Sequence, residues 1–426
     1  MRSVFVLLHR FVGLGLAGFL FVAGLTGAVI SWDHELDEVL NPDLMAAPGR
    51  GPLLDPLVLA DKLAAEEPQS FITYVPLHAE EGHSLAFGVA PRFDAQTGTP
   101  FDTGYNQIFV DPVTGAVLGK REWGAAWPIS RKTFVSFLYV LHYNLHIPFM
   151  AGTDRWGFWL MGGVALFWMV DCFVGFYLTL PIRKRRAAAT RAKGSGDWWK
   201  RWKPAWKIKW RGSAYRINFD LHRAFSLWTW VLLFLLALTG ASLNLYREVT
   251  LPVVSLFSSF TPTPFDTRPI LPPAAQSGPQ VSYTQVLARA EAEAARRGIT
   301  MPAGDVFFAP AYGTYGVRFF EPGDEHGDGL GLGPVTLYYD SADARPLGDW
   351  VPWRGTAGDV FLQLQFPVHS GRIAGIAGRI LVSVMGLGVA MLSVTGVVIW
   401  HRKRRARLAS RRPTGATQHR NIVSAE

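Results

Sequence analysis

Four long apolar stretches constrain this 426-residue chain more than any other feature of its sequence. Phe11–Trp32, Ala224–Tyr246 and Ile380–Trp400 contain no charged residue, and each is long enough to cross a hydrocarbon core of about 30 Å as a helix. The remaining stretch, the second in chain order, is Trp156–Leu180. It is interrupted only by Asp171, a lone acid that should face protein rather than lipid. The sequence therefore predicts an α-helical membrane protein with four transmembrane helices.

The first stretch also has the length of a cleavable signal peptide. It lacks a clear small-x-small cleavage site, and its sequence pattern recurs in the third stretch, which no signal peptidase would remove. We therefore expect the first stretch to be retained as a transmembrane helix.

The basic residues predict the orientation of the chain, because short cytoplasmic loops and tails carry excess Lys and Arg. Segment 182–223 holds 14 basic residues against two Asp, and the tail 401–426 holds eight against one Glu. Both termini should therefore be cytoplasmic, and segments 33–155 and 247–379 should lie in a bacterial periplasm. Since membrane orientation explains the net charge of +9, nucleic acid is not expected as a partner.

Five tryptophans lie among the lysines and arginines of the predicted cytoplasmic loop: Trp198, Trp199, Trp202, Trp206 and Trp210. Tryptophan at four-residue spacing forms a stripe on a helix, although Pro204 should interrupt that helix. We favour an anchor at the membrane interface, with the lysines directed at lipid phosphates. A docking surface for an acidic electron donor is the alternative.

Two halves of the chain share one set of sequence landmarks. Leu8-His9-Arg10 and Leu25-Thr26-Gly27-Ala28 recur as Leu221-His222-Arg223 and Leu238-Thr239-Gly240-Ala241, all at an offset of 213 residues. After each set, the chain continues through an outer segment to a second apolar stretch that ends in Arg and Lys. We therefore predict two parallel repeats of helix, outer domain and helix, related by an axis along the membrane normal.

Each outer segment should be a small α+β domain, because a helical pattern is followed by alternating strands and turns. Leu57–Glu67 and Ser282–Arg297 predict helices, whereas Tyr105–Val110 and Thr336–Tyr339 predict strands. The Pro- and Gly-rich stretches Thr261–Pro279 and Glu321–Pro334 have the composition of linkers or flexible surface.

These patterns predict eight consecutive parts of the chain. They are a first transmembrane helix (1–32), a first outer domain (33–130), a short outer-face helix with the second transmembrane helix (131–181), the basic loop (182–220), the third transmembrane helix (221–246), a second outer domain (247–357), a second short helix with the fourth transmembrane helix (358–401) and a basic tail (402–426).

The placement of the histidines is the strongest chemical signal. His9 and His222 hold the same position at the cytoplasmic start of two spans, while His142, His146 and His369 precede the other two spans on the outer side. Neutral imidazole suits haem iron. Pairing His9 with His222, and His142 or His146 with His369, would form two bis-histidine sites for haem b. The lone Cys172 excludes the CxxCH motif that attaches haem covalently.

Alternatives stay open among these residues. A histidine at a helix end is more often a cap or an interfacial residue than a ligand, but recurrence in both halves favours ligands here. We prefer His142 to His146 as the outer ligand. His401 could compete as an inner ligand, although snorkelling beside Arg402 is favoured. Asp171 could hydrogen-bond a histidine or an arginine, or face a small cavity.

Of the other histidines, His34 could reach the outer layer, whereas a surface position is expected for His78, His83, His326 and His419.

Four motifs carry a resemblance to a known family: Leu8-His9-Arg10 with Leu25-Thr26-Gly27, Leu141–His146, Asp171–Pro181 and Pro367–Gly371. With them, nearly the whole chain resembles the PepSY-associated transmembrane family of iron-regulated membrane proteins, and in particular FoxB-type ferric-siderophore reductases. Asp111-Pro112-Val113-Thr114-Gly115 is similar to the strand-turn signature of PepSY domains, whereas the corresponding Asp340–Ala344 lacks the glycine.

This resemblance implies a bacterial inner-membrane oxidoreductase with two haems b and two periplasmic PepSY-like domains. It would pass electrons outward to reduce Fe(III) held by a siderophore and release Fe(II). No residue would act as a catalytic acid or base. The implied partners are a ferric siderophore, a cytoplasmic or quinol electron donor and membrane lipids.

Three other functions compete with this interpretation. The first is a quinol-linked cytochrome b that passes electrons to another protein. The second is a PepSY-bearing regulator of periplasmic peptidases, with histidines that only pack. The third is an iron or siderophore permease, which is disfavoured because four spans with few polar groups offer little of a substrate path.

Overall fold

The computed structural model describes residues 1–182, 198–324 and 333–410. Contacts between Cα atoms divide the chain into two compact units. Unit 1 comprises Met1–Phe21, Phe167–Leu233 and Gly388–Glu426, and unit 2 comprises Val22–Leu166 and Phe234–Leu387. Long helices contribute to both units, whereas the β-sheet belongs entirely to unit 2.

Among the described residues, three helices are long and apolar enough to cross a membrane. They are α1 (Arg2–Ile30), α6 (Trp156–Thr179) and α14 (Gly375–Ser410), which is preceded by the short η6 (Arg372–Ala374). A fourth span is possible if α8 (Ala214–Trp228) and α9 (Trp230–Asn244) cross as one bent pair. The chain is therefore a membrane protein that also contains a β-sheet region.

The third span differs from the straight helix expected over Ala224–Tyr246. Its two helices meet at Thr229 with a bend of 71°. The Thr229 hydroxyl donates to the Phe225 carbonyl (2.8 Å), and the Ser226 hydroxyl donates to the Arg223 carbonyl (3.0 Å). Hydroxyl groups that bond back to the preceding turn are known to bend helices. The segment contains neither Pro nor Gly at the bend, so its composition does not reveal the break.

The tryptophan-rich loop is partly a packing element of unit 1. α7 (Trp198–Trp202) is followed by η2 (Lys203–Trp206), so Pro204 lies in a tight helical turn. Trp202 is buried with Ala205 and Leu227, while Trp199 remains exposed. The loop therefore anchors itself on the helices through one tryptophan and presents others outward.

Unit 2 contains one antiparallel sheet of eight strands, in the order β10-β9-β8-β7-β1-β2-β5-β6. The first outer segment supplies β1 (Ser70–Pro76), β2 (Leu85–Pro91), β5 (Gln107–Val110) and β6 (Val117–Arg121). The second supplies β7 (Ala303–Ala309), β8 (Thr314–Phe319), β9 (Val335–Asp340) and β10 (Pro346–Trp350). β1 pairs with β7, so the two segments meet in the middle of a shared sheet. A separate hairpin joins β3 (Phe93–Asp94) and β4 (Thr99–Pro100).

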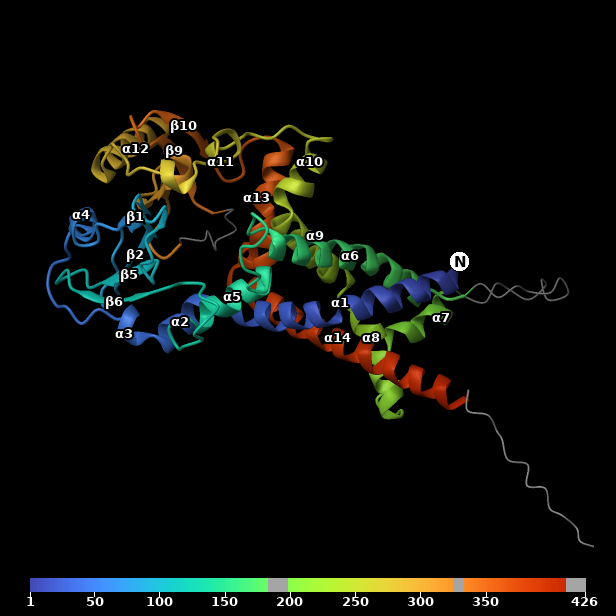
Figure 1. The fold of residues 1–426 in the computed structure, drawn as a ribbon. Coiled ribbons are helices and arrows are strands. Elements are labelled where there is room, and N and C mark those ends of the chain that lie inside the picture. Colours follow the sequence, from blue (N-terminus) through green and yellow to red (C-terminus); the bar gives the residue numbers. More distant parts are fainter. Residues whose placement is uncertain (183–197, 325–332, 411–426) are drawn as a thin grey trace, which may run out of the picture. The chain divides into compact units, whose positions relative to one another are not determined.

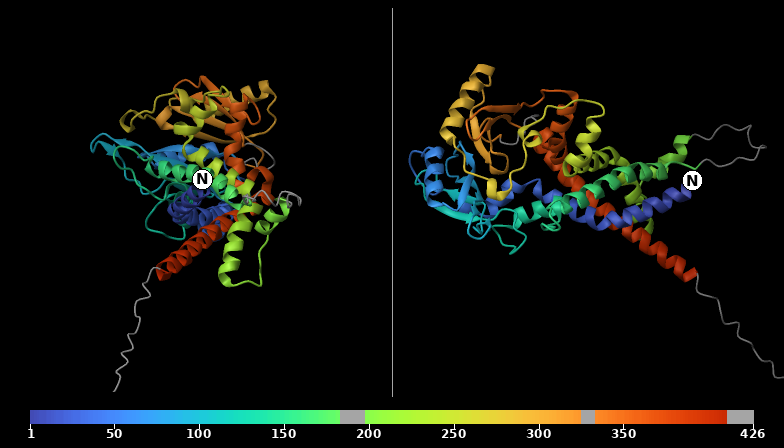
Figure 2. Two further views of the ribbon diagram at one scale, coloured as in Figure 1. Left: turned by 90° about the vertical axis from the view of Figure 1, so that its right-hand side faces the viewer. Right: turned by 45° about the horizontal axis from the view of Figure 1, so that its top comes forward.

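Two helices cover the same face of this sheet (Figures 1 and 2), α4 (Pro56–Glu66) and α12 (Tyr283–Arg297). Each buries its apolar stripe against the strands of its own segment, and Leu77 and Tyr283 pack against both resulting cores. α12 begins at a Ser282 capping box and ends at Gly298 in the left-handed conformation, close to its predicted bounds.

The short helices before the spans are α5 (Phe134–Asn144) and α13 (Ala357–Ser370). α5 ends before Pro148, because Leu145 and His146 adopt positive φ angles of 59° and 53°. α13 contains Pro367 inside the helix and ends at Ser370, where Gly371 adopts the left-handed conformation. A proline removes one helical hydrogen bond but does not always end the helix.

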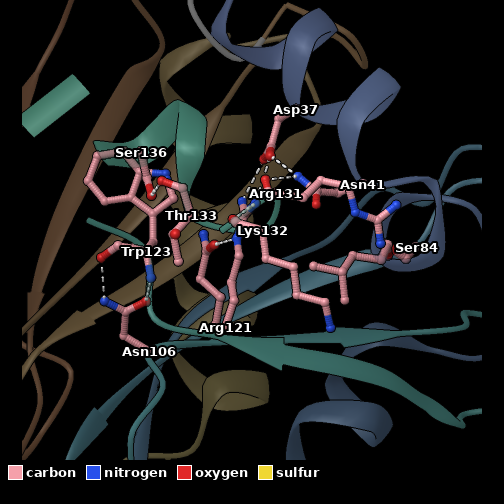
Figure 3. Close-up of polar contacts among 12 residues, drawn as sticks. Asp37, Asn41, Ser84, Asn106, Arg121, Trp123, Arg131, Lys132, Thr133 and Ser136 are labelled. Atoms are coloured by element: carbon pink, nitrogen blue, oxygen red, sulfur yellow. Dashed lines mark hydrogen bonds and ion pairs between the residues drawn. The ribbon is translucent and has the colours of Figure 1, made fainter. Parts of the chain in front are cut away.

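A buried ion pair joins the first outer segment to the chain that leads into α5 (Figure 3). Arg121 of β6 contacts Asp37 of α2 (Asp33–Leu40) at 2.7 Å. Asn41, just before α3 (Pro42–Met45), also donates to Asp37, and Arg121 donates to the Lys132 carbonyl two residues before α5. This network fixes α2, the edge strand β6 and the start of α5 against one another.

Replacing Asp37 with alanine should lower the free energy of unfolding of unit 2 by about 3–5 kcal/mol, because Arg121 would be left buried without its counter-charge. The midpoint of thermal unfolding in detergent measures the effect. Asp43→Ala is the matched control, since Asp43 pairs with Arg131 on the surface and its loss should cost less than about 1 kcal/mol. Equal midpoints for the two variants would contradict this role of the ion pair.

Candidate functional site

Four of the predicted ligand histidines form two pairs, one within each unit. In unit 1, His9 of α1 and His222 of α8 have ring centres 6.3 Å apart and planes inclined by 60°. In unit 2, His142 of α5 and His369 of α13 have ring centres 6.0 Å apart and planes inclined by 61°. The near-identical geometry is notable because the residues come from four different helices.

Three of these histidines are oriented by a threonine on a neighbouring helix. The Nδ1 atoms of His142, His369 and His222 lie 3.1, 2.8 and 3.0 Å from the hydroxyl oxygens of Thr26, Thr239 and Thr395, respectively. Each hydroxyl donates its own hydrogen to a carbonyl one turn earlier in its helix. The threonine oxygen must therefore accept from the ring, which assigns the proton to Nδ1 and leaves Nε2 with a free lone pair.

His9 has a different partner. Its Nδ1 lies 2.9 and 3.0 Å from the two carboxylate oxygens of Asp171 on α6. A carboxylate oxygen accepts hydrogen bonds, so the Nδ1–H of His9 is the donor in this contact, as at the other three rings. Asp171 is 8% exposed, and its contact with His9 accounts for the lone acid within the second apolar stretch.

A glycine lies against each of the four rings. A methyl group built on Gly27 would lie 2.9 Å from His142, on Gly396 3.3 Å from His222, on Gly240 3.4 Å from His369 and on Gly175 3.6 Å from His9. Three of these glycines directly follow the orienting threonine. A Thr-Gly pair therefore serves each of three rings: the hydroxyl fixes the orientation, and the missing side chain allows close approach.

Burial keeps the His142–His369 pair neutral. It lowers the pKa of His142 to about 4, and burial together with the neighbouring His142 lowers the pKa of His369 to about 3. Both rings are thus uncharged at pH 7, the form in which imidazole binds a metal.

The spacing of both pairs would fit a metal held between the two histidines. Two metal–nitrogen bonds of about 2.0–2.1 Å, with about 1.1 Å from each nitrogen to its ring centre, separate the ring centres by about 6.3 Å. The observed separations are 6.3 and 6.0 Å. In the described part of the chain, no group of three or more His, Cys, Asp or Glu residues could hold a metal ion by itself. Each histidine pair supplies only two donors, so it could hold iron in a cofactor that brings further ligands of its own, such as haem.

The remaining histidines lie outside the pairs. His146 stacks on Phe137, and its Nε2 is 2.8 Å from the Phe137 carbonyl, so it does not join His142 opposite His369. His401 is exposed beside Trp400. Two others differ in exposure: His34 is exposed, and His78 is partly buried. His83 pairs with Glu38 at 2.8 Å, while His326 and His419 lie outside the described residues.

Sequence reasoning used two of the Thr-Gly pairs, at Thr26 and Thr239, only as markers of duplication. It missed Thr395-Gly396 and Gly175 altogether. The available signal was the recurrence of Thr-Gly in three of the four apolar stretches, each time at a depth that matches a histidine of another stretch.

Comparison with known proteins gives one clear result. A family model described as the PepSY-associated TM region matches residues 6–403. Among curated proteins, no match is found.

Gly27→Ala should displace the His142 ring, because the new methyl group would lie 2.9 Å from its Cε1 atom. Loss of the bonds to Thr26 and the Ala23 carbonyl should cost about 1–3 kcal/mol of stability. Gly18→Ala is the control in the same helix, since nothing lies within 4 Å of that methyl group. A lower thermal midpoint for Gly27→Ala alone is expected, and equal midpoints would argue against close packing of the ring.

Proposed function

The chain belongs to the PepSY-associated TM family, and from that premise we propose that it is a haem-dependent oxidoreductase. It would reduce siderophore-bound Fe(III) in the periplasm with electrons carried across the inner membrane. The observation that carries the proposal is the pair of histidine sites, with ring separations of 6.3 and 6.0 Å and every Nδ1 engaged by an acceptor. The assignment to FoxB-type ferric-siderophore reductases is part of the same proposal.

Two haems b would be held, one by His9 and His222 and one by His142 and His369. Bound haem supplies a one-electron Fe(III)/Fe(II) couple at each pair. The histidines would bind the iron through Nε2, and Thr26, Thr239, Thr395 and Asp171 would fix the rings through Nδ1. His146 is left out of this ligand set because its Nε2 faces the Phe137 carbonyl.

We also propose that the chain consists of two parallel repeats, each a helix, an outer segment and a helix. The offset of 213 residues between matching motifs supports this, as does the contribution of four antiparallel strands by each outer segment. Within this arrangement the termini would be cytoplasmic and the sheet periplasmic, in accordance with the basic residues of segment 182–223 and of the tail.

The proposed substrate, which the resemblance implies, agrees with iron chemistry. Siderophore oxygens are hard ligands that favour Fe(III), so addition of one electron weakens the chelate and releases Fe(II). This step transfers an electron and requires no acid or base from the protein. The chain's own residues would hold the redox couples, tune them and exclude water from them.

The electrons must come from a separate donor, either a cytoplasmic reductase or quinol in the bilayer. Gly13–Gly18 spells G-x-G-x-x-G, but it lies inside the long helix α1 and not at the turn between a strand and a helix. It is therefore not a dinucleotide-binding fingerprint. A quinol donor would deliver two electrons, one for each of two ferric ions.

The purified protein should contain about two haems b per chain by pyridine haemochrome assay, one per histidine pair. His9→Ala and His222→Ala should each lose one haem, and His142→Ala and His369→Ala should each lose the other. His146→Ala is the matched control and should retain both, because His146 stands outside the pairs. A haem-free wild-type protein would refute the proposal and favour a non-enzymatic PepSY regulator.

Dithionite-reduced protein in anaerobic proteoliposomes should be reoxidised by ferric siderophores, with Fe(II) trapped by ferrozine in a one-to-one ratio with the haem oxidised. The corresponding gallium(III) complexes, which cannot accept the electron, are the control for binding alone. His369→Ala should lose this reaction if the outer pair delivers the electron. Reoxidation by a quinone but by no ferric siderophore tested would instead favour a quinol-linked cytochrome b.

A further inference from the structure

The two histidine pairs are alike in geometry but not in charge. Three rings donate Nδ1–H to a neutral threonine hydroxyl, whereas His9 donates to the carboxylate of Asp171. The Nδ1 atoms of the His142–His369 pair therefore have only neutral acceptors, whereas one Nδ1 of the His9–His222 pair has an anionic acceptor.

At His9, an aspartate takes the place of the threonine that accepts the hydrogen bond at the other three rings. Gly175 packs against His9 as Gly27, Gly240 and Gly396 pack against the other rings, but the residue before Gly175 is Val174 instead of threonine. Val174 has no hydroxyl group. Asp171 lies one helical turn earlier on α6 and supplies the acceptor from there. The fourth site therefore keeps the glycine of the pattern and replaces the neutral acceptor with a charged one.

No lysine or arginine forms an ion pair with Asp171 in the described part of the chain. Asp171 is 8% exposed, and among the ion pairs of the described residues its only partner is His9. A buried carboxylate that accepts from a ligand histidine increases the electron density on the ligating nitrogen. Both this effect and the negative charge itself stabilise Fe(III) relative to Fe(II) at that site.

We propose that Asp171 makes the two redox sites inequivalent by lowering the reduction potential of the haem held by His9 and His222 below that of the haem held by His142 and His369. This inference rests on the proposed function. Asp171 is a positioning residue that acts through His9. Its consequence is directional: electron transfer from the His9–His222 site to the His142–His369 site becomes downhill, which favours outward flow toward the ferric substrate.

The test is a spectroelectrochemical titration of full-length protein with both haems bound. Wild type should show two midpoint potentials. Asp171→Asn keeps the size of the side chain and an oxygen acceptor but removes the charge, and it should raise only the lower potential. A tenfold loss of preference for Fe(III), at the lower end of typical effects of such partners, corresponds to about 60 mV for a one-electron couple.

A double variant separates charge from positioning. Asp171→Ala combined with Val174→Thr recreates at His9 the Thr-Gly pair found at the other three histidines. It should retain the haem and show the same raised potential as Asp171→Asn. Asp171→Glu keeps the charge and should leave the potential closer to wild type. Thr239→Val, at the other pair, should leave the lower potential unchanged.

The outcomes are distinct. An unchanged lower potential in Asp171→Asn and in the double variant would overturn the inference while two haems per chain still upheld the proposed cofactors. Loss of the haem from both variants would show that Asp171 only holds the ring, which also overturns the inference. A wild-type protein that contains no haem would overturn both this inference and the proposed function.

Discussion

The hydrogen bond from each histidine Nδ1 to an acceptor on a neighbouring helix is the interaction on which the arrangement of helices around both sites depends. An unsatisfied N–H in a low-dielectric interior costs about 1–3 kcal/mol, so each ring must find an acceptor. α1, α9 and α14 supply threonine oxygens, and α6 supplies Asp171. These acceptors hold each imidazole in one tautomer and one orientation, and thereby bring two free Nε2 atoms to each site.

Close packing of helices makes these bonds possible. A ring can approach a helix only where the side chain is absent, and each of the four rings lies against a glycine. Glycine is unfavourable within a helix by about 1 kcal/mol relative to alanine, so its use at Gly27, Gly240 and Gly396 has a cost that the bond to the preceding threonine offsets. The absence of a side chain also allows Gly386 of α14 to lie close to the backbone of Gly24 in α1.

Much of the fold can be predicted from the sequence, because its strongest features are long apolar stretches and regular alternation of apolar and polar residues. Apolar length predicted the long helices, and alternation predicted the strands of the outer segments. The bend at Thr229 was missed because hydroxyl groups that bond to the preceding turn look ordinary in a sequence. Pro367 lies inside α13 although proline usually ends a helix, because the remaining bonds of α13 outweigh the one that is lost. The pairing of β1 with β7 could not be predicted, because the sequence of neither strand indicates which strand it pairs with.

That pairing bears directly on the outer histidines, because α5 follows the edge strand β6 and α13 follows the opposite edge strand β10. The two helices therefore follow opposite edges of one sheet, and the β1–β7 register determines how the halves of that sheet meet. Asp305 of β7 is fully buried at this seam and accepts from Tyr74 of β1 and Arg318 of β8. A slip of one residue between β1 and β7 would move Tyr74 away from Asp305, whereas Arg318 on β8 would stay in place. The loss of one hydrogen bond to a buried carboxylate is unfavourable, so Asp305 favours the observed register. Paired in this register, β1 and β7 join the two sets of strands that lead into the helices carrying His142 and His369.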